Sequence, residues 1–159
     1  MTTYINPTPG NDAREVTLKV YHTSASADAT GLAIPSLQDI TLNNSNDVFT
    51  WTQLDRGSKL QIATTATNSL SMNIVLDTVS FFGNASASAN TAVKSGIFGL
   101  SKDKTRVEFD LYFGDDQTGN TKTITGFAYV TGLAPTVSAD SPVWVSPITL
   151  TVDGDYTVE

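Results

Sequence analysis

Apolar and polar side chains alternate along several segments of the chain, and this alternation is the strongest structural signal in the sequence. Residues 16–21, 69–76 and 106–113 each place apolar side chains at every second position. The clearest of these segments is 106–113, whose apolar positions are Val107, Phe109, Leu111 and Phe113. A period of two with one apolar and one polar side is typical of an antiparallel sheet that covers a core on one face and meets water on the other.

Shorter segments predict further strands. Residues 48–54 have Phe49 and Trp51 on one side, and the turn at 55–58 leads into a second extended segment at 59–64. These two segments predict a β-hairpin. Residues 121–131 predict another strand, which follows a turn at 114–120.

The last predicted strand, residues 143–152, changes its apolar phase along its length. Val143 and Val145 lie on one side, whereas Ile148, Leu150 and Val152 lie on the other, and Pro147 stands at the change. Proline cannot donate a ladder hydrogen bond, so we expect an edge strand or a bulge here.

A single segment has helical spacing. Residues 88–101 carry apolar side chains three and four positions apart, at Ala89, Ala92, Val93, Ile97 and Leu100. Ser88 or Asn90 is suited to cap the start, and Gly96 and Gly99 weaken the helix by about 1 kcal/mol each relative to alanine. The sequence therefore predicts one short helix.

Two long stretches lack either period. Residues 23–36 are rich in Ser, Ala and Thr, and residues 134–142 contain two prolines. Loops of more than about 12 residues are uncommon in compact domains and often carry function. The first stretch is interpreted either as an arm that orders against a neighbouring molecule or as a surface loop without such a role.

Charge and composition limit the partners. The chain has 159 residues, 9 basic and 16 acidic side chains and a formal net charge of −7. We expect one domain over 1–159 with an acidic C-terminal end at 153–159. This charge argues against a protein that binds nucleic acid through a basic surface. The absence of cysteine excludes thiol catalysis, zinc–thiolate sites and disulfides. We expect no membrane partner and no secretory signal, and hence synthesis in the cytoplasm.

The candidates for catalysis and metal binding are few. His22 is the single histidine, it ends a predicted strand, and no nucleophile motif of the G-x-S-x-G type accompanies it. Asp115 and Asp116 lie in a segment that looks like a calcium loop, but Gly126 stands where an EF-hand needs glutamate. A hairpin turn explains these residues better. We therefore expect no enzymatic activity, no metal and no cofactor.

Three segments of the C-terminal third resemble a known family. They are Phe-Asp-Leu-Tyr-Phe-Gly at 109–114, Gly-Phe-Ala-Tyr-Val-Thr-Gly-Leu-Ala-Pro-Thr-Val at 126–137, and Asp-Ser-Pro-Val at 140–143 followed by Ile-Thr-Leu-Thr-Val-Asp-Gly at 148–154. They resemble the major tail tube proteins of long-tailed bacteriophages, in which a strand ending in Val-x-Gly leads through a proline-containing loop to a final strand closed by glycine. Residues 36–57 are compatible with the early sheet of that family.

The resemblance implies a mostly β fold, an antiparallel β-sandwich or half-barrel flanked by one short helix. It also implies that six copies form a ring, and that rings stack into a tube in the virion through which DNA passes. The expected partners are then other copies of the chain, other tail proteins at the tube ends, and passing DNA without specific binding. Acidic side chains on the channel wall would keep DNA from adhering to it.

The two irregular stretches are the predicted contacts between copies. Loop 23–36 has the length to reach a neighbouring ring, and 134–142 is placed to touch an adjacent subunit. The residues expected at these contacts are Ser26, Asp28, Thr30, Leu32, Pro135, Val137 and Pro142. No residue is assigned to the channel wall.

Two other functions fit the same sequence features. A capsid decoration protein would also be small and β-rich, but it predicts trimers without a channel. A carbohydrate-binding β-sandwich predicts a monomer with Trp51 or Trp144 exposed on a concave face, supported by Phe127 and Tyr129. Because all four aromatic residues lie in predicted strands, packing or subunit contact is the better interpretation of them.

Overall fold

The computed structural model of the chain describes residues 16–34, 37–55, 57–114, 121–140 and 143–159. Eight strands in this part of the chain form one sheet in the order β2-β1-β5-β6-β7-β4-β3, with β8 paired to β6, and every pairing is antiparallel. The strands are β1 (Val16–His22), β2 (Leu32–Ala33), β3 (Leu37–Trp51), β4 (Leu60–Val75), β5 (Arg106–Phe113), β6 (Lys122–Leu133), β7 (Val145–Val152) and β8 (Thr157–Val158). The mostly β, antiparallel fold predicted from the sequence is confirmed.

One face of this sheet carries the hydrophobic core. Most of the alternating apolar positions predicted in 16–21, 69–76 and 106–113 are buried, and Leu18, Phe109 and Leu150 have no exposed surface. Adjacent strands place these residues side by side, for example Leu18 opposite Leu111 and Val20 opposite Phe109. Burying an apolar side chain of this size contributes about 1.5–3 kcal/mol, so the register follows from the alternation.

Two helices cover the core face. The predicted helix is α2 (Ala92–Lys102), which packs against β1, β2 and β6, and its N-cap is Thr91 rather than Ser88 or Asn90. A second helix that the sequence pattern did not predict, α1 (Thr78–Phe82), packs against α2 and buries Phe81. The five residues of α1 are too few to show a helical period, which explains why the pattern missed it.

Two glycines allow the helices to meet. Gly96 interrupts α2 with φ +64° and ψ 171°, and Gly83 ends α1 with φ +94°. A Cβ on Gly96 would overlap the backbone of Phe81, Phe82 and Gly83. Of the two glycines that weaken the predicted helix, Gly96 is therefore required by the structure, because the end of α1 contacts α2 at this kink.

The pairing of β7 corrects the expectation for Pro147. β7 lies between β6 and β4 and is not an edge of the sheet, and its register with β4 runs without a bulge from Ser69–Thr151 to Val75–Val145. Its register with β6 does shift, between Val130 and Gly132, so the irregularity lies in β6 and not at Pro147. The partner β6 pairs only as far as Ile148, so the imino nitrogen of Pro147 faces no ladder partner there. Ser146, Ile148 and Leu150 are all buried on the core face of β7. The strand therefore keeps the same side toward the core, and the apolar pattern shifts because the buried residue before Pro147 is a serine.

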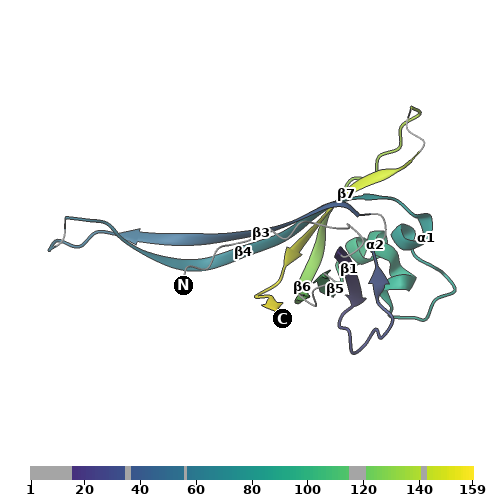
Figure 1. The fold of residues 1–159 in the computed structure, drawn as a ribbon, viewed down its shortest axis with the longest axis horizontal. Helices are drawn as coiled ribbons and strands as arrows, with labels where there is room; N and C mark the ends of the chain where they lie inside the picture. The colour runs from purple at the N-terminus through teal and green to yellow at the C-terminus, as the bar shows by residue number, and fades with distance from the viewer. Residues whose placement is uncertain (1–15, 35–36, 56, 115–120, 141–142) are drawn as a thin grey trace, which may run out of the picture.

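The longest feature is a two-stranded arm. The predicted hairpin of residues 48–64 and the predicted strand 69–76 are parts of one antiparallel pair, the 15-residue β3 and the 16-residue β4. Figure 1 shows this pair leaving the body of the molecule, with its tip and the two helices at opposite ends of the long axis. A second, shorter projection rises beyond the end of β6, where residues 134–140 and 143–144 lie before β7.

Neither helix in the described part of the chain has the length and apolar character needed to cross a membrane.

Candidate assembly surfaces

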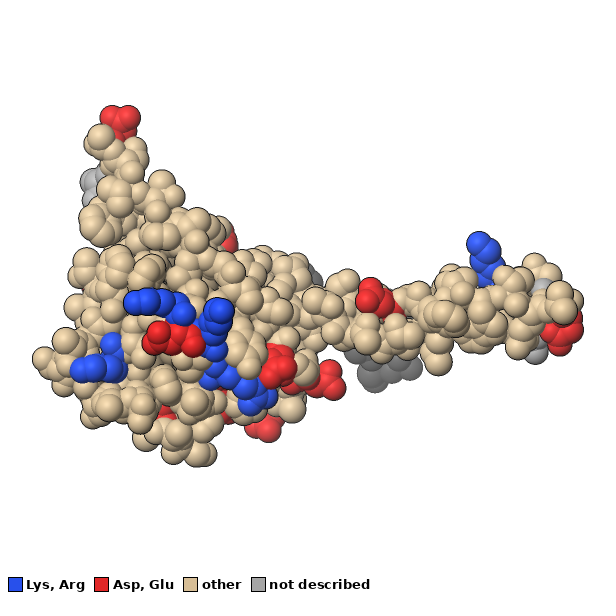
Figure 2. All heavy atoms as spheres, turned by 180° about the vertical axis from the view of Figure 1, so that it is seen from behind, with Lys and Arg blue, Asp and Glu red and all other residues tan. Residues whose placement is uncertain are grey.

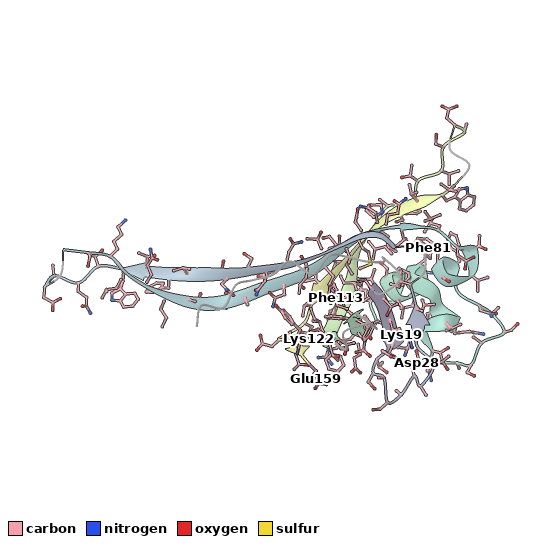
Figure 3. All side chains as sticks on the ribbon, in the orientation of Figure 1. Lys19, Asp28, Phe81, Phe113, Lys122 and Glu159 are labelled. Atoms are coloured by element: carbon pink, nitrogen blue, oxygen red, sulfur yellow. The ribbon has the colours of Figure 1, made fainter. Side chains whose placement is uncertain are left out.

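The outer half of the arm is exposed and extends away from the described part of the body. In β4, residues 61–67 are all exposed, whereas burial alternates from Asn68 onward. β4 pairs with β7 only from Ser69, so residues 60–68 extend beyond the sheet by about 30 Å at ~3.3 Å per residue. Figure 3 shows side chains projecting from both sides of this segment. A two-stranded ribbon is marginally stable in water by itself, which makes this arm a candidate contact surface.

The tip of the arm has one apolar face. Phe49 lies opposite Ile62, and Trp51 opposite Leu60, so these four side chains share one side of the ribbon. The rings of Phe49 and Trp51 stack with their centroids 6.0 Å apart. Phe49 and Ile62 are 59% and 56% exposed. We call this face, formed by Phe49, Trp51, Leu60 and Ile62, the arm-tip patch.

A second apolar surface lies on the helices at the other end of the molecule. Val79, Phe82 and Phe98 are each about half exposed, and we call them the helix patch. The ring of Phe82 lies 5.6 Å from that of Phe98 and 4.9 Å from that of the buried Phe81. Phe81 therefore anchors the exposed rings to the core, which makes the helix patch a rigid surface.

The face of the sheet opposite the core is polar. Register places Lys19 beside Asp110 and Tyr21 beside Glu108, and threonines of β6 and β7 continue the face toward β4. Burial raises the pKa of the Tyr21 phenol, and the nearby Asp110 carboxylate raises it further, so the phenol stays neutral at physiological pH. Arg106 binds Asp153 at 2.6 Å and covers the Phe127 ring at 3.9 Å. Basic and acidic groups thus alternate on this face.

Charges are unevenly distributed between body and arm. Figure 2 shows most of the visible Lys, Arg, Asp and Glu side chains on the body, and only a few along the arm. The arm is therefore a largely uncharged surface in a chain whose formal charge is −7.

Two of the predicted contact residues in loop 23–36 belong to the core of the subunit. Asp28 is 1% exposed and Leu32 is 6% exposed. The Asp28 carboxylate accepts hydrogen bonds from the backbone N–H groups of Ala92 at 2.7 Å, His22 at 3.0 Å and Gly31 at 3.2 Å. These bonds tie the loop to β1 and α2, so the side chains of Asp28 and Leu32 hold the loop in place and do not face a neighbour.

The electrostatics of Asp28 follow from those bonds. Burial alone raises the pKa of a carboxyl group, but the backbone donors of Ala92, His22 and Gly31 favour the ionised form. Together they outweigh burial and hold the pKa of Asp28 below its ordinary value. The sequence could not reveal this role, because Ala92 is 64 positions away.

The other predicted contact residues are exposed or lie outside the described residues. Ser26 and Thr30 are exposed on the loop, and Pro135 and Val137 on the shorter projection. Pro142 lies outside the described residues. The projection is fixed to the start of β7 by a pair of backbone hydrogen bonds between Thr136 and Val145.

The candidates for other chemistry do not converge. Trp51 lies on the arm, whereas Trp144 lies beside Leu76 at the base of the shorter projection, so the tryptophans form no joint stacking platform. His22 ends β1, as predicted, and its backbone N–H binds Asp28. Asp115 and Asp116 lie outside the described residues. Among the described residues, no group of three or more His, Asp or Glu side chains gathers at one point.

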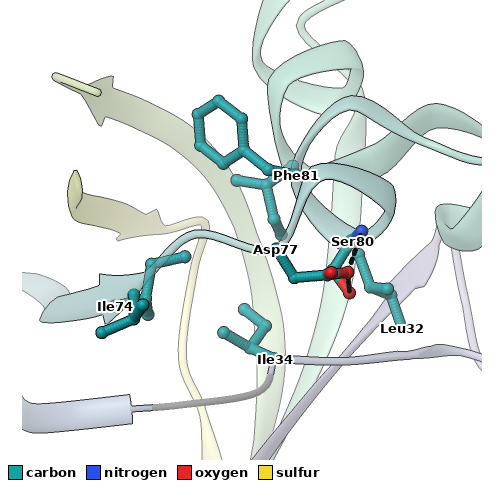
Figure 4. A pocket seen from close by; sticks show the side chains of 8 residues that line it. Leu32, Ile34, Ile74, Asp77, Ser80 and Phe81 are labelled. Atoms are coloured by element: carbon teal, nitrogen blue, oxygen red, sulfur yellow. Dashed lines mark hydrogen bonds between the residues drawn. The ribbon is translucent and has the colours of Figure 1, made fainter. Parts of the chain in front are cut away.

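A small hollow lies between the end of β4, β2 and α1 (Figure 4). Its walls are mostly apolar, with Ile34, Ile74 and Phe81 among them, and its volume is about 10 Å³. This space holds about one water molecule. Asp77 at its rim is the N-cap of α1. Its carboxylate accepts hydrogen bonds at 3.0 Å from the backbone N–H and the hydroxyl of Ser80. The hollow is a packing gap beside a helix cap.

The fold was compared with known protein families, curated sequences and solved structures. No protein-family model and no curated protein sequence matches the chain. Among solved structures, it superposes on a chain from the tail of an empty gene transfer agent particle, refined with C6 symmetry, with a TM-score of 0.64 and 10% identity over 94% of this chain and 98% of that chain. It superposes on the SPP1 tail tube protein with a TM-score of 0.62 and 11% identity over 93% of this chain and 78% of that chain.

The chain has the tail tube fold. A third structure, from the sixfold-symmetrised baseplate of the anti-feeding prophage, agrees with a TM-score of 0.61 and 13% identity, and covers 100% of this chain and 97% of that chain. The three matches cover between 93% and 100% of this chain. The fold that the sequence resemblance implied is confirmed.

Proposed function

We propose that this protein is the repeating subunit of a phage-type tail tube. Six copies close into a ring, rings stack into a tube, and the tube conducts DNA without binding it specifically. The role is structural and not enzymatic, the chief partner is the chain itself, and other tail proteins meet the tube at its ends. The protein is made in the host cytoplasm and resides in the virion.

The observation that carries this proposal is the arm. Within the tail tube fold, residues 61–67 expose both faces of β4, and the tip presents an apolar patch to solvent. Exposed patches of this kind mark interaction sites, and an isolated ribbon does not hold its shape in water. A neighbouring copy supplies the missing contacts.

The edges of the sheet support ring closure. β3 is one edge, and at the other edge the two-residue β2 covers only Lys19 and Val20 of β1. Exposed strand edges promote pairing with another chain, and a closed barrel removes them. In a ring, the β1 side of one copy meets the β3 side of the next, and the six sheets form one continuous wall.

The polar face of the sheet then lines the channel. Its threonines, together with Lys19, Asp110 and the paired Arg106, give a hydrated wall with both signs of charge. Alternating charges leave no extended basic surface that would hold a polyanion. The helices, on the opposite face, lie on the outside of the tube.

The test is assembly of the purified protein, followed by negative-stain electron microscopy. We expect hollow tubes or sixfold rings. In a matched variant, residues 46–66 are replaced by Asn-Gly, which joins Ser45 to its register partner Thr67 by a two-residue turn. This variant keeps the β4–β7 pairing, so we expect an unchanged far-UV spectrum and cooperative melting, without rings or tubes.

Other outcomes would contradict the proposal. Trimeric particles without a channel would support a capsid decoration protein, and a stable monomer that binds polysaccharide would support a carbohydrate-binding module. Tubes formed by the armless variant would show that the arm is not the assembly element.

A further inference from the structure

We propose that the arm-tip patch of one copy packs on the helix patch of another copy. This inference rests on the proposed tube function and names the two surfaces that meet. It assigns Phe49, Trp51, Leu60 and Ile62 on the donor, and Val79, Phe82 and Phe98 on the acceptor.

The first argument is that the two patches cannot cover each other within one molecule. The tip of the arm and the helices lie at opposite ends of the long axis (Figure 1). Both patches are therefore open to solvent in a single copy, and each needs a partner from outside. A contact between two different surfaces of the same chain is heterologous, and such contacts produce closed rings or filaments.

The second argument is the match in chemistry and shape. The arm-tip patch is flat, one-sided and aromatic, and Phe49 and Trp51 already lie parallel to within 23°. The helix patch presents two phenylalanine rings held against the buried Phe81. Aromatic rings on both sides favour stacked and edge-to-face contacts, and a rigid acceptor lowers the entropy lost on binding.

The third argument is the charge at the rims. Lys59 directly precedes the arm-tip patch, and Asp77 directly precedes α1. Hydrogen bonds from Ser80 hold the pKa of Asp77 below its ordinary value, so Asp77 carries a negative charge at neutral pH. Lys94 on the helix side and Asp47 and Asp55 on the arm side provide the reverse combination. Each rim thus carries both signs, which lets opposite charges face each other.

The shorter projection is the rival acceptor, because Val137 and Trp144 are also exposed. It is attached to the sheet at its base through the Thr136–Val145 bridge, and the described residues above that bridge make no packed cluster comparable to the three rings on the helices. The helix patch is the more preorganised surface, and we assign the arm to it.

The experiment uses the absence of cysteine from the chain, which gives introduced thiols no background. Phe49→Cys and Phe82→Cys are purified separately, mixed under assembly conditions and oxidised. We expect a covalent dimer that contains one of each variant. The double variant should form a ladder of covalent oligomers, since each copy donates one arm and accepts another. Phe49→Cys mixed with Val137→Cys is the control for the rival acceptor and should give no such dimer.

A matched pair of substitutions tests the face of the arm. Val48 and Phe49 are adjacent and similarly exposed, at 53% and 59%, but they point to opposite sides of the ribbon. We expect Phe49→Ser and Phe82→Ser each to raise the protein concentration needed for assembly at least tenfold, whereas Val48→Ser leaves it within about twofold.

The outcomes separate this inference from the function on which it rests. Tubes or rings without a cross-link between positions 49 and 82, or with the cross-link to position 137 instead, overturn the assignment of surfaces and leave the tube function intact. If the wild-type protein forms neither rings nor tubes and the mixed cysteine variants give no cross-link, both the assignment of surfaces and the tube function are overturned. Equal effects of Val48→Ser and Phe49→Ser would also contradict a one-sided contact.

Discussion

Replacing Asp28 is expected to destabilise the subunit more than any other single change in loop 23–34. Its carboxylate is almost completely buried, with Oδ2 accepting from the N–H groups of Ala92 and His22 and Oδ1 accepting from that of Gly31. Asp28→Ala removes all three acceptor contacts at once. The donors of Ala92 and Gly31 would remain buried, where water reaches them poorly.

The magnitude follows from those donors. A buried N–H left without an acceptor costs about 1–3 kcal/mol. Two buried donors and one half-buried donor therefore give a loss of about 3–6 kcal/mol for Asp28→Ala. Asp28→Asn keeps one oxygen in the site but places an amide N–H against another donor, so we expect a smaller loss of about 1–3 kcal/mol. Since domains of this size are stable by about 5–15 kcal/mol, the alanine variant approaches the limit of folding.

The pH dependence provides an independent check. The pKa of Asp28 in the folded protein lies below its ordinary value, so folding favours the ionised form. This contribution is fully present above the unfolded pKa of about 3.9 and is lost as pH falls through the lower folded value. The stability difference between wild type and Asp28→Asn should therefore be constant from pH 7 to about pH 5 and shrink below about pH 3.9.

The measurement is urea unfolding followed by circular dichroism, at concentrations where sedimentation shows monomers, so that assembly adds nothing to stability. Asp77→Ala is the matched control, because Asp77 also caps backbone N–H groups but does so in solvent. We expect a clearly smaller loss for the control. An Asp28→Ala variant within about 1 kcal/mol of wild type would refute the assignment of Asp28 as a buried acceptor for three donors.

Three further changes have expected outcomes. Gly96→Ala should lower the unfolding free energy by about 2–5 kcal/mol, because Gly96 has φ +64° and an added Cβ would overlap the backbone of α1. Gly99→Ala in the same helix is the control and should change the unfolding free energy by less than about 1 kcal/mol, as measured by urea unfolding. Arg106→Ala should lower the unfolding free energy by less than about 1 kcal/mol, because the ion pair of Arg106 with Asp153 is nearly half exposed. High salt should remove this difference between variant and wild type, which melting at several salt concentrations can show. In a Trp144→Phe background, the remaining Trp51 should shift its fluorescence to shorter wavelengths on assembly, and an unchanged spectrum in tubes would argue against burial of the arm tip.

Alternation predicted the body of the fold because burial there is one-sided. In 106–113 the odd positions Val107, Phe109 and Leu111 are buried, as the sequence indicated, whereas Phe113 at the end of the strand is exposed. The even positions are all at least partly exposed. The strands at 16–21 and 121–131 were placed within two residues of β1 and β6 at each end. The helix was found for the same reason, since Ala92, Ile97 and Leu100 are its buried positions.

The arm escaped the same reasoning because neither of its faces is buried in the subunit. Residues 61–67 are exposed on both sides, so no selection for an apolar period acts on them from within the molecule. Residues 43–46 are Asn-Asn-Ser-Asn, a composition typical of turns, although they pair in register with β4, and the register shifts just beyond them, between Asn46 and Val48. The sequence predicted the tip as a hairpin with Phe49 and Trp51 on one side, which is confirmed, but it divided the arm into separate elements.

The candidate contacts were predicted from loop length, which does not reveal where a side chain points. Asp28 and Leu32 lie in the right kind of segment but face inward, because residues distant in sequence close around them. One residue of the helix patch, Phe98, could have been recognised in the sequence. Phe98 does not belong to the apolar positions of the predicted helix, and a large aromatic residue off the core face marks an exposed contact.

The boundary between body and arm separates the residues that stabilise the subunit from those that are available for contact with another copy. Up to the pair Asn44–Asn68 the strands have a buried face, and Asn44 still reaches the Tyr156 hydroxyl at 3.3 Å. Beyond that pair every position of β4 up to Gln61 is exposed, so substitutions there cost little stability in the monomer. In the proposed tube, stability depends on the body and assembly depends on the arm, so variants of the two regions should be separable by melting and by microscopy. In the proposed assembly, the body keeps the single subunit folded, and the apolar arm tip becomes buried only on contact with another copy.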